Sequence, residues 1–164
     1  MLRTTIDLDA IAHNTRRLRE QTSAELMCVV KADAYNHGVE RCVPVMEAGG
    51  ADAFGVATFA EARRVRELTT KPVLAWLWDP QEELPAGVDV GVPSFTHLQS
   101  LIDAPTAPTA YLKVDTGMHR SGIDEVRWQE AFELALDAQR KGKLTVAGLM
   151  THLSCADDPA DPYT

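Results

Sequence analysis

The chain has 164 residues, of which 45% are hydrophobic and 24% are charged, so it is long enough to bury one sizeable core. Its formal net charge is -8, from 24 acidic and 16 basic residues. This balance argues against nucleic acid or an anionic membrane as a partner, because both select a basic surface. Three cysteines without C-x-x-C spacing and the lack of a long apolar span favour a cytoplasmic protein.

Apolar periodicity and end signals predict helices and strands in alternation. In chain order these are helix 6–20, strand 26–30, helix 38–48, strand 53–58, helix 59–68, strand 72–78, strand 88–93, helix 95–103, strand 110–115, helix 124–140 and strand 144–152. The first helix has Asp7 or Asp9 as its cap or first-turn acid. Strands joined through helices form a parallel sheet with right-handed crossovers, either doubly wound or closed into a barrel.

The barrel is favoured by two observations. No G-x-G-x-x-G or G-x-x-x-x-G-K follows any predicted strand, which weakens the nucleotide-binding, doubly wound alternative. Polar residues also gather just after the strand ends, and in a β/α barrel those ends meet on the face that carries the active site. These residues are Lys31, Tyr35, Thr58, Asp79, residues 115–120 and His152. We therefore expect an incomplete β/α barrel.

Lys31 is the most informative of these residues. It ends the apolar run 26–30 and is followed by small, polar and aromatic residues. A lysine at the end of a buried strand either reaches water or acts as a nucleophile or a base. Strand-end lysines are common, so the spacing alone leaves a structural role open.

Two later segments carry further candidates. In residues 112–123, Arg120 lies between two glycines, where its planar guanidinium is placed to hold a carboxylate or a phenolic oxygen. The ordinary alternative is a loop arginine paired with Asp115 or Asp124. His152 ends an apolar strand and is either a residue of the strand rim or a catalytic group. No pair of histidines has the spacing of metal ligands, so we expect no metal site.

Taken together, these segments resemble bacterial alanine racemases, which are fold-type III pyridoxal-phosphate enzymes. Residues 29–38 resemble the family's cofactor-lysine signature, approximately A-V-V-K-A-N-A-Y-G-H-G. Residues 54–62, 113–123 and 148–157 match later family segments in the same order. Three positions depart from the family pattern. Asp33 occupies a position where the family usually has asparagine, and Asn36 and His119 occupy positions where it usually has glycine.

The resemblance implies a role for each residue in the first half of the chain. Lys31 forms the Schiff base with pyridoxal 5'-phosphate and is the base that serves the α-proton on the D-face. Tyr35 donates a hydrogen bond to the cofactor phosphate. Trp76 packs near the cofactor, although filling of the core accounts for it nearly as well.

It also implies roles in the second half. Arg120 contacts the phenolic oxygen of the cofactor and the carboxylate of the substrate, and His152 packs or hydrogen-bonds near the pyridine ring. Lys113 stands at a position that is often carbamylated in the family, where an anionic carbamate would orient Arg120.

The resemblance finally implies that residues 1–164 are the amino-terminal part of the pyridoxal-phosphate-binding barrel domain, with about six of the eight strands of such a barrel. The C-terminal β-domain, which carries the second base, a tyrosine, lies outside the chain. The parent would be a homodimer that interconverts L-alanine and D-alanine for peptidoglycan precursors. The isolated chain would be inactive, would bind the cofactor weakly or not at all and would self-associate.

Two alternatives share these motifs. One is another fold-type III enzyme, either a broad-specificity amino-acid racemase or a D-threonine aldolase, the latter needing a metal site. The other is a non-catalytic module that binds pyridoxal phosphate, although such proteins complete their barrel.

Overall fold

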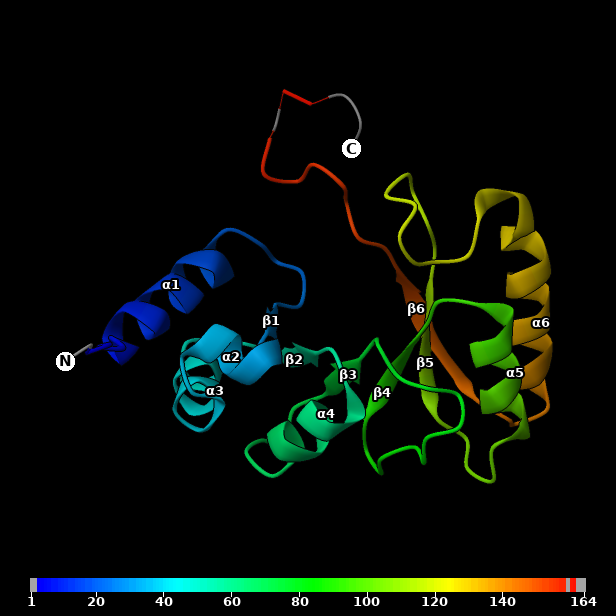
Figure 1. Cartoon of the computed structure of the whole chain (residues 1–164), viewed down its shortest axis with the longest axis horizontal. Coiled ribbons are helices and arrows are strands. Elements are labelled where there is room, and N and C mark those ends of the chain that lie inside the picture. Colours follow the sequence, from blue (N-terminus) through cyan, green and yellow to red (C-terminus); the bar gives the residue numbers. More distant parts are fainter. Residues whose placement is uncertain (1–2, 159, 162–164) are drawn as a thin grey trace. The chain divides into compact units, whose positions relative to one another are not determined.

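Six strands alternate with helices along the chain, except that β4 follows β3 with no described helix between them (Figure 1). The structure, a computed structural model, describes residues 3–158, 160 and 161. The strands are β1 (Met27–Val29), β2 (Ala53–Val56), β3 (Val73–Ala75), β4 (Asp89–Val92), β5 (Thr109–Lys113) and β6 (Thr145–Met150). The helices are α1 (Leu8–Glu20), α2 (Lys31–Asn36), α3 (Val39–Ala48), α4 (Phe59–Arg66), α5 (Phe95–Asp103) and α6 (Trp128–Arg140), with a 3-10 turn, η1 (Glu125–Arg127), before α6.

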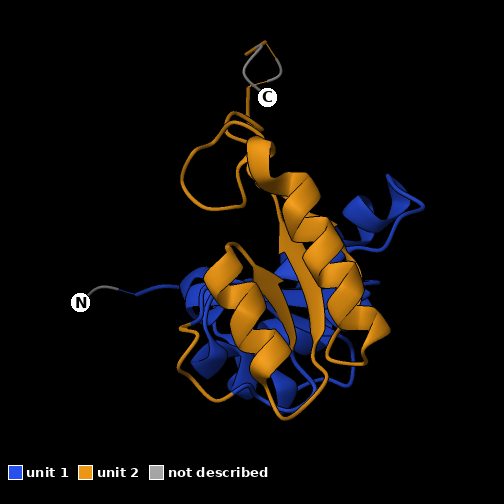
Figure 2. Ribbon diagram, turned by 90° about the vertical axis from the view of Figure 1, so that its right-hand side faces the viewer, with its two compact units in different colours: residues 1–78, 84–88 blue, residues 79–83, 89–164 orange. Residues whose placement is uncertain are grey.

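The chain divides into two compact units (Figure 2). Unit 1 comprises Met1–Trp78 and Leu84–Val88, and unit 2 comprises Asp79–Glu83 and Asp89–Thr164. Each unit contains three parallel strands with their helices. The predicted α/β class with six parallel strands is therefore confirmed within the units.

In unit 1, β2 pairs with β1 on one side and with β3 on the other. Every residue of β2 and β3 is buried, as expected for parallel strands that are covered on both faces. Helix α4 packs on these two strands, and its Phe59, Ala62 and Val65 are at most 1% exposed. This spacing of three residues is the apolar stripe of an amphipathic helix. The core of unit 1 thus includes Val30 and Phe59, the chain neighbours of Lys31 and Thr58.

In unit 2, β5 pairs with β4 and β6, and α5 and α6 lie side by side over one face of these strands (Figure 2). Helix α6 turns Ala131, Ala135 and Ala138 toward the core, and small side chains at this spacing allow a close approach to the sheet. A register shift between Ala110 and Tyr111 interrupts the pairing of β5 with β6.

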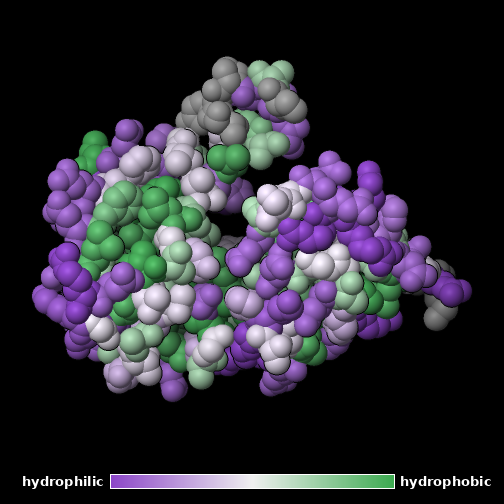
Figure 3. All heavy atoms as spheres, turned by 180° about the vertical axis from the view of Figure 1, so that it is seen from behind, coloured by the Kyte–Doolittle hydropathy of each residue, from purple (hydrophilic) through white to green (hydrophobic). Residues whose placement is uncertain are grey.

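Strand β6 is the least covered strand of unit 2. Its residues alternate between exposed and half-buried, and Leu149 remains 58% exposed. Figure 3 shows apolar atoms gathered on the part of the surface that this unit forms. The expected self-association of the chain stays a prediction.

The helix starts follow the sequence signals. Asp7, rather than Asp9, caps α1, since its carboxylate accepts a hydrogen bond from the Ala10 amide at 3.0 Å. Thr58 and Ser94 cap α4 and α5 in the same way. Within the described residues, no helix has both the length and the hydrophobicity needed to cross a membrane.

The structure differs from the sequence predictions at three places. Residues 31–36, for which no element was predicted, form a left-handed helical turn. The expected helix 124–140 becomes α-helical only at Trp128, after the 3-10 turn. The expected strand 72–78 is regular only over Val73–Ala75, although the Leu77 amide still donates a hydrogen bond to the Ala57 carbonyl at 2.7 Å. Beyond it, the ring of Trp78 stacks on Phe59, with 5.4 Å between ring centroids.

Candidate active site

A left-handed turn follows Lys31. Ala32, Asp33, Ala34, Tyr35 and Asn36 all have φ between 50° and 67°, although none of them is glycine. The left-handed conformation costs roughly 1–2 kcal/mol for each such residue. Strain of this kind persists only where the surroundings hold it in place, and it concentrates at functional sites.

The turn brings Lys31 and Tyr35 together. The Lys31 Nζ atom lies 5.7 Å from the centroid of the Tyr35 ring, within the range of a cation–π contact. Lys31 is half-buried at the end of β1, whereas Tyr35 is 56% exposed. A primary amine and a phenol thus share one face of the turn, and both are accessible to a ligand.

The carboxylate of Glu61, on α4, is bound to the first amide after Lys31. Its Oε1 accepts a hydrogen bond from the Ala32 amide at 2.8 Å, and its Oε2 accepts bonds from the amides of Ala57 and Thr58 at 2.8 and 3.1 Å. Burial raises the pKa of Glu61, but the three amide donors and the nearby Lys31 ammonium outweigh it, so the pKa is lowered from its ordinary value. Glu61 is therefore ionised where it meets the turn.

A second link to α4 runs through Asp33. Its Oδ1 accepts a hydrogen bond from the Val39 amide at 3.0 Å and lies 3.1 Å from Nη2 of Arg64, which also pairs with Glu40. The family's usual asparagine could make the amide contact but not the ion pair. Because these side chains are more than a third exposed, the ion pair contributes only about 0–1 kcal/mol.

Trp76 lies against Gly55 of the neighbouring strand. A Cβ atom on Gly55 would stand 2.8 Å from Cζ3 of the Trp76 ring, so only glycine leaves room for the indole here. The half-buried ring therefore has a packing role within unit 1. Its expected contact with the cofactor stays a prediction.

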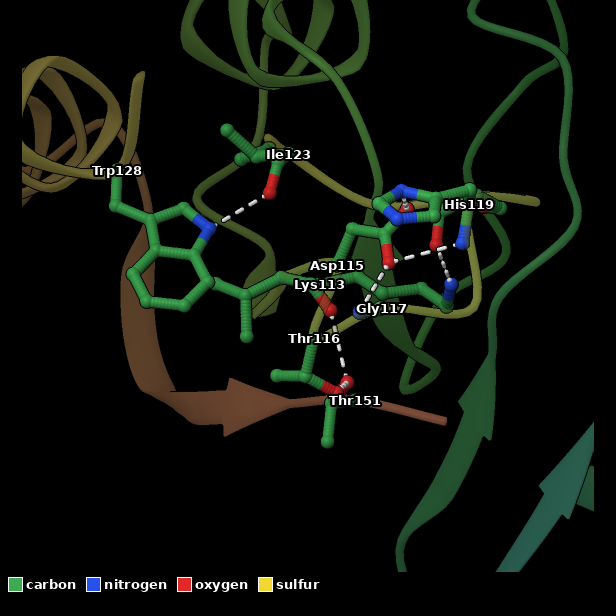
Figure 4. Close-up of polar contacts among 10 residues, drawn as sticks. Lys113, Asp115, Thr116, Gly117, His119, Ile123, Trp128 and Thr151 are labelled. Atoms are coloured by element: carbon green, nitrogen blue, oxygen red, sulfur yellow. Dashed lines mark hydrogen bonds and ion pairs between the residues drawn. The ribbon is translucent and has the colours of Figure 1, made fainter. Parts of the chain in front are cut away.

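In unit 2, the loop from Asp115 to Gly122 is held at both ends (Figure 4). Parallel bridge pairing joins Val114 to Ile123, and the indole of Trp128 donates a hydrogen bond to the Ile123 carbonyl at 2.7 Å. Asp115 accepts hydrogen bonds from the amides of Gly117 and His119 at 2.9 and 3.1 Å. These hydrogen bonds lower the pKa of Asp115, and the one from the His119 amide has the larger effect.

Lys113 is buried beneath this loop, at 7% exposure, and its Nζ donates a hydrogen bond to the carbonyl oxygen of Ser121. Burial lowers the pKa of Lys113, the neighbouring Arg120 lowers it further, and Asp115 partly opposes both. More of the Lys113 amine is therefore neutral at a given pH than in an exposed lysine.

Arg120 is exposed on the same loop. Within the described ranges, neither Asp115 nor Asp124 lies at ion-pair distance from it, and Asp115 instead faces His119 at 3.6 Å. The paired arrangement of the ordinary alternative is therefore not formed in the described part of the chain, and the role of Arg120 stays a prediction. His152 is exposed directly after β6, next to Thr151, whose hydroxyl lies 2.8 Å from that of Thr116 in the loop (Figure 4).

The predicted site residues thus form two sets. Lys31, Tyr35 and Trp76 belong to unit 1, where the left-handed turn pairs the first two. Lys113, Arg120 and His152 belong to unit 2, where Lys113 and Arg120 are close enough to interact electrostatically.

Comparison with known proteins shows the family of this chain. The profile described as "Alanine racemase, N-terminal domain" matches residues 6–164, nearly the whole chain. The chain belongs to the alanine racemase family. The resemblance predicted from residues 29–38 and the later segments is therefore confirmed.

Two relatives, one compared by sequence and one by structure, show how much of the family this chain covers. The alanine racemase of Corynebacterium efficiens is 51% identical over 100% of this chain and 46% of its own length. The crystal structure of alanine racemase from Corynebacterium glutamicum superposes with a TM-score of 0.89 at 46% identity, covering 94% of this chain and 46% of the other. The chain spans about half the length of the curated relatives it matches, and its fold corresponds to part of the alanine racemase barrel domain.

The sequence predictions did not include the contact between Glu61 and Ala32. The spacing of Thr58 and Glu61 is the signature of a capping box, which the structure shows at α4. The bond from Glu61 to Ala32 joins residues 29 positions apart and has no local signal.

Proposed function

We propose that this chain is the part of an alanine racemase that holds pyridoxal phosphate through Lys31. The observation that carries the proposal is the strained left-handed turn, which places the Lys31 amine and the Tyr35 phenol on one face. These two groups fit the ends of the cofactor. An amine condenses with an aldehyde, and a phenol donates a hydrogen bond to a phosphate.

Racemisation of alanine would require the chain to bind the cofactor and to transfer the α-proton. The Lys31 amine would hold pyridoxal phosphate at the end of β1 and would become free again when alanine takes its place. Nζ would then accept or donate the α-proton on one face of the substrate, and inversion requires a second acid–base group on the opposite face. Bound pyridoxal phosphate supplies the electron sink that makes this proton acidic.

In unit 2, Arg120 offers an exposed guanidinium that suits a substrate carboxylate or the phenolic oxygen of the cofactor, and His152 offers an imidazole for the pyridine ring. We propose these as their roles in the whole protein. Racemisation of alanine by a cytoplasmic homodimer is likewise our proposal for the whole protein, and it rests on family membership.

The test is selective labelling of Lys31. The chain is incubated with pyridoxal phosphate, reduced with borohydride, digested and mapped by mass spectrometry. We expect the label on the peptide that contains Lys31 to exceed that on the exposed Lys143 by about tenfold or more, because a prepared site raises the local occupancy. A chain with Lys31→Arg should keep only the background label. Equal labelling of Lys31 and Lys143 would refute the proposal.

Lys113 is proposed as a carbamylation site. Its neutral amine can attack carbon dioxide, forming a carbon–nitrogen bond and releasing a proton, which leaves an anion near Arg120. Because burial lowers its pKa, uptake of isotope-labelled bicarbonate should be detectable by carbon NMR near neutral pH, increase with pH and disappear in Lys113→Ala. A Lys143→Ala chain serves as the control and should keep the signal. Its loss there, instead of in Lys113→Ala, would refute the assignment.

A further inference from the structure

We propose that Glu61 is a positioning residue for Lys31, because its carboxylate fastens the first amide of the left-handed turn to helix α4. This inference rests on the proposed function of Lys31 and deepens it. It concerns how the chain holds its reactive amine in place.

The argument begins with the strain in the turn. Five consecutive residues without glycine stay in the left-handed region only if contacts outside the turn compensate for the cost. The Ala32 amide is the first backbone donor after Lys31, and Glu61 accepts its hydrogen bond at 2.8 Å. A charge-assisted hydrogen bond of this kind is about twice as strong as a neutral one. Glu61 is therefore placed to fix the backbone of the residue next to the amine.

The two carboxylate oxygens separate this role from helix capping. Oε2 accepts hydrogen bonds from the amides of Ala57 and Thr58, and the bond from Thr58 completes the capping box. Oε1 accepts a hydrogen bond from the amide of Ala32, which precedes β2 in the sequence, whereas Glu61 follows it. Capping alone does not account for this second contact, whereas fastening of the turn does.

The ion pair of Asp33 with Arg64 reinforces the same connection. Glu61 and Arg64 lie three residues apart on α4 and so share one face of the helix. They contact consecutive residues of the turn, Ala32 and Asp33. Helix α4 thus holds the turn through a partly buried carboxylate and a surface ion pair, the first being the stronger.

The experiment uses conservative variants of the chain. Glu61→Gln keeps the size of the side chain but has only one acceptor oxygen, so it cannot serve both sets of amides. Glu61→Asp keeps two acceptors on a shorter side chain. Thr58→Ala removes the hydroxyl half of the capping box and leaves the carboxylate, and Glu67→Gln changes an exposed carboxylate at the end of the same helix.

Two quantities are measured. The first is hydrogen exchange of the Ala32 amide by NMR, which needs no cofactor. The second is the pyridoxal-phosphate label on Lys31 relative to Lys143 after borohydride reduction. We expect Glu61→Gln and Glu61→Asp to speed exchange at Ala32 by about tenfold and to lower the relative label by about as much, since a broken contact opens the turn locally. Thr58→Ala and Glu67→Gln should change both by less than about twofold.

Circular dichroism identifies which variants fold, and either folded Glu61 variant decides the question. The inference is overturned if a folded variant leaves exchange at Ala32 unchanged, or if Thr58→Ala reproduces its effects, which would make Glu61 merely a helix cap. If the unsubstituted chain takes no selective label at Lys31, the proposed function fails, and exchange at Ala32 still decides whether Glu61 fastens the turn.

Discussion

Replacing Gly122 by alanine is expected to destabilise unit 2 by about 3 kcal/mol, the largest effect among the substitutions considered. Gly122 has a φ of 136°, which alanine adopts only with strain. A Cβ atom there would also stand 2.7 Å from the Asp115 amide nitrogen and 2.8 Å from the Val114 carbonyl carbon. Both obstacles are backbone atoms of a paired strand end, which cannot turn aside as a flexible side chain could.

The same clash reaches the buried lysine. Gly122 stands between Ser121, whose carbonyl accepts the hydrogen bond of Lys113, and Ile123, whose amide donates to the Lys113 carbonyl at 2.8 Å. Displacing the loop removes both contacts and leaves a buried ammonium without its acceptor, which is costly. Loss of loop structure and loss of stability should therefore appear together.

Urea denaturation of the two chains measures the effect, and Gly142→Ala is the matched control. Gly142 also has a positive φ, 67°, but nothing lies within 4 Å of a Cβ built on it. Its substitution should cost only the left-handed strain, about 1 kcal/mol. Equal costs at the two glycines would show that the close approach of the Asp115 backbone does not exist in solution.

The alternation of strands and helices could be predicted from the sequence because it depends on local patterns. Continuous apolar runs mark strands buried on both faces, and Asp7, Thr58 and Ser94 mark helix starts through their own side-chain oxygens. The ends of strands were predicted less well. The run 72–78 is apolar throughout, so nothing local shows that the regular strand ends at Ala75.

The candidate site was predictable only in part, and through resemblance. The matching motifs indicated Lys31 and Tyr35 as a pair, and the structure brings them together. The left-handed turn between them had no adequate local signal, because alanine, aspartate and tyrosine all prefer the right-handed or extended regions. The contact of Glu61 with Ala32 was also hidden, since it depends on the register that sets α4 beside the end of β1.

This conformation leads to a second prediction, in which one type of substitution changes sign between two sites. Ala32 and Ala60 are both exposed alanines of unit 1, but Ala32 has a φ of 50° while Ala60 lies in the regular helix α4. Ala32→Gly should stabilise the chain by about 0.5–1 kcal/mol, because relief of left-handed strain exceeds the extra chain entropy of glycine. Ala60→Gly should destabilise it by about 0.5–1 kcal/mol, the ordinary cost of glycine in a helix.

Substitution by valine should also have different effects on stability at Ala32 and at Ala60. A β-branched residue in the left-handed region is a genuine outlier, so Ala32→Val should cost about 2 kcal/mol or more. Ala60→Val should cost only about 0.5 kcal/mol through helix propensity. The four free energies of unfolding are compared by urea denaturation. If glycine destabilises at both sites, the turn after Lys31 is not left-handed in solution, and the strain that Glu61 is proposed to hold does not exist.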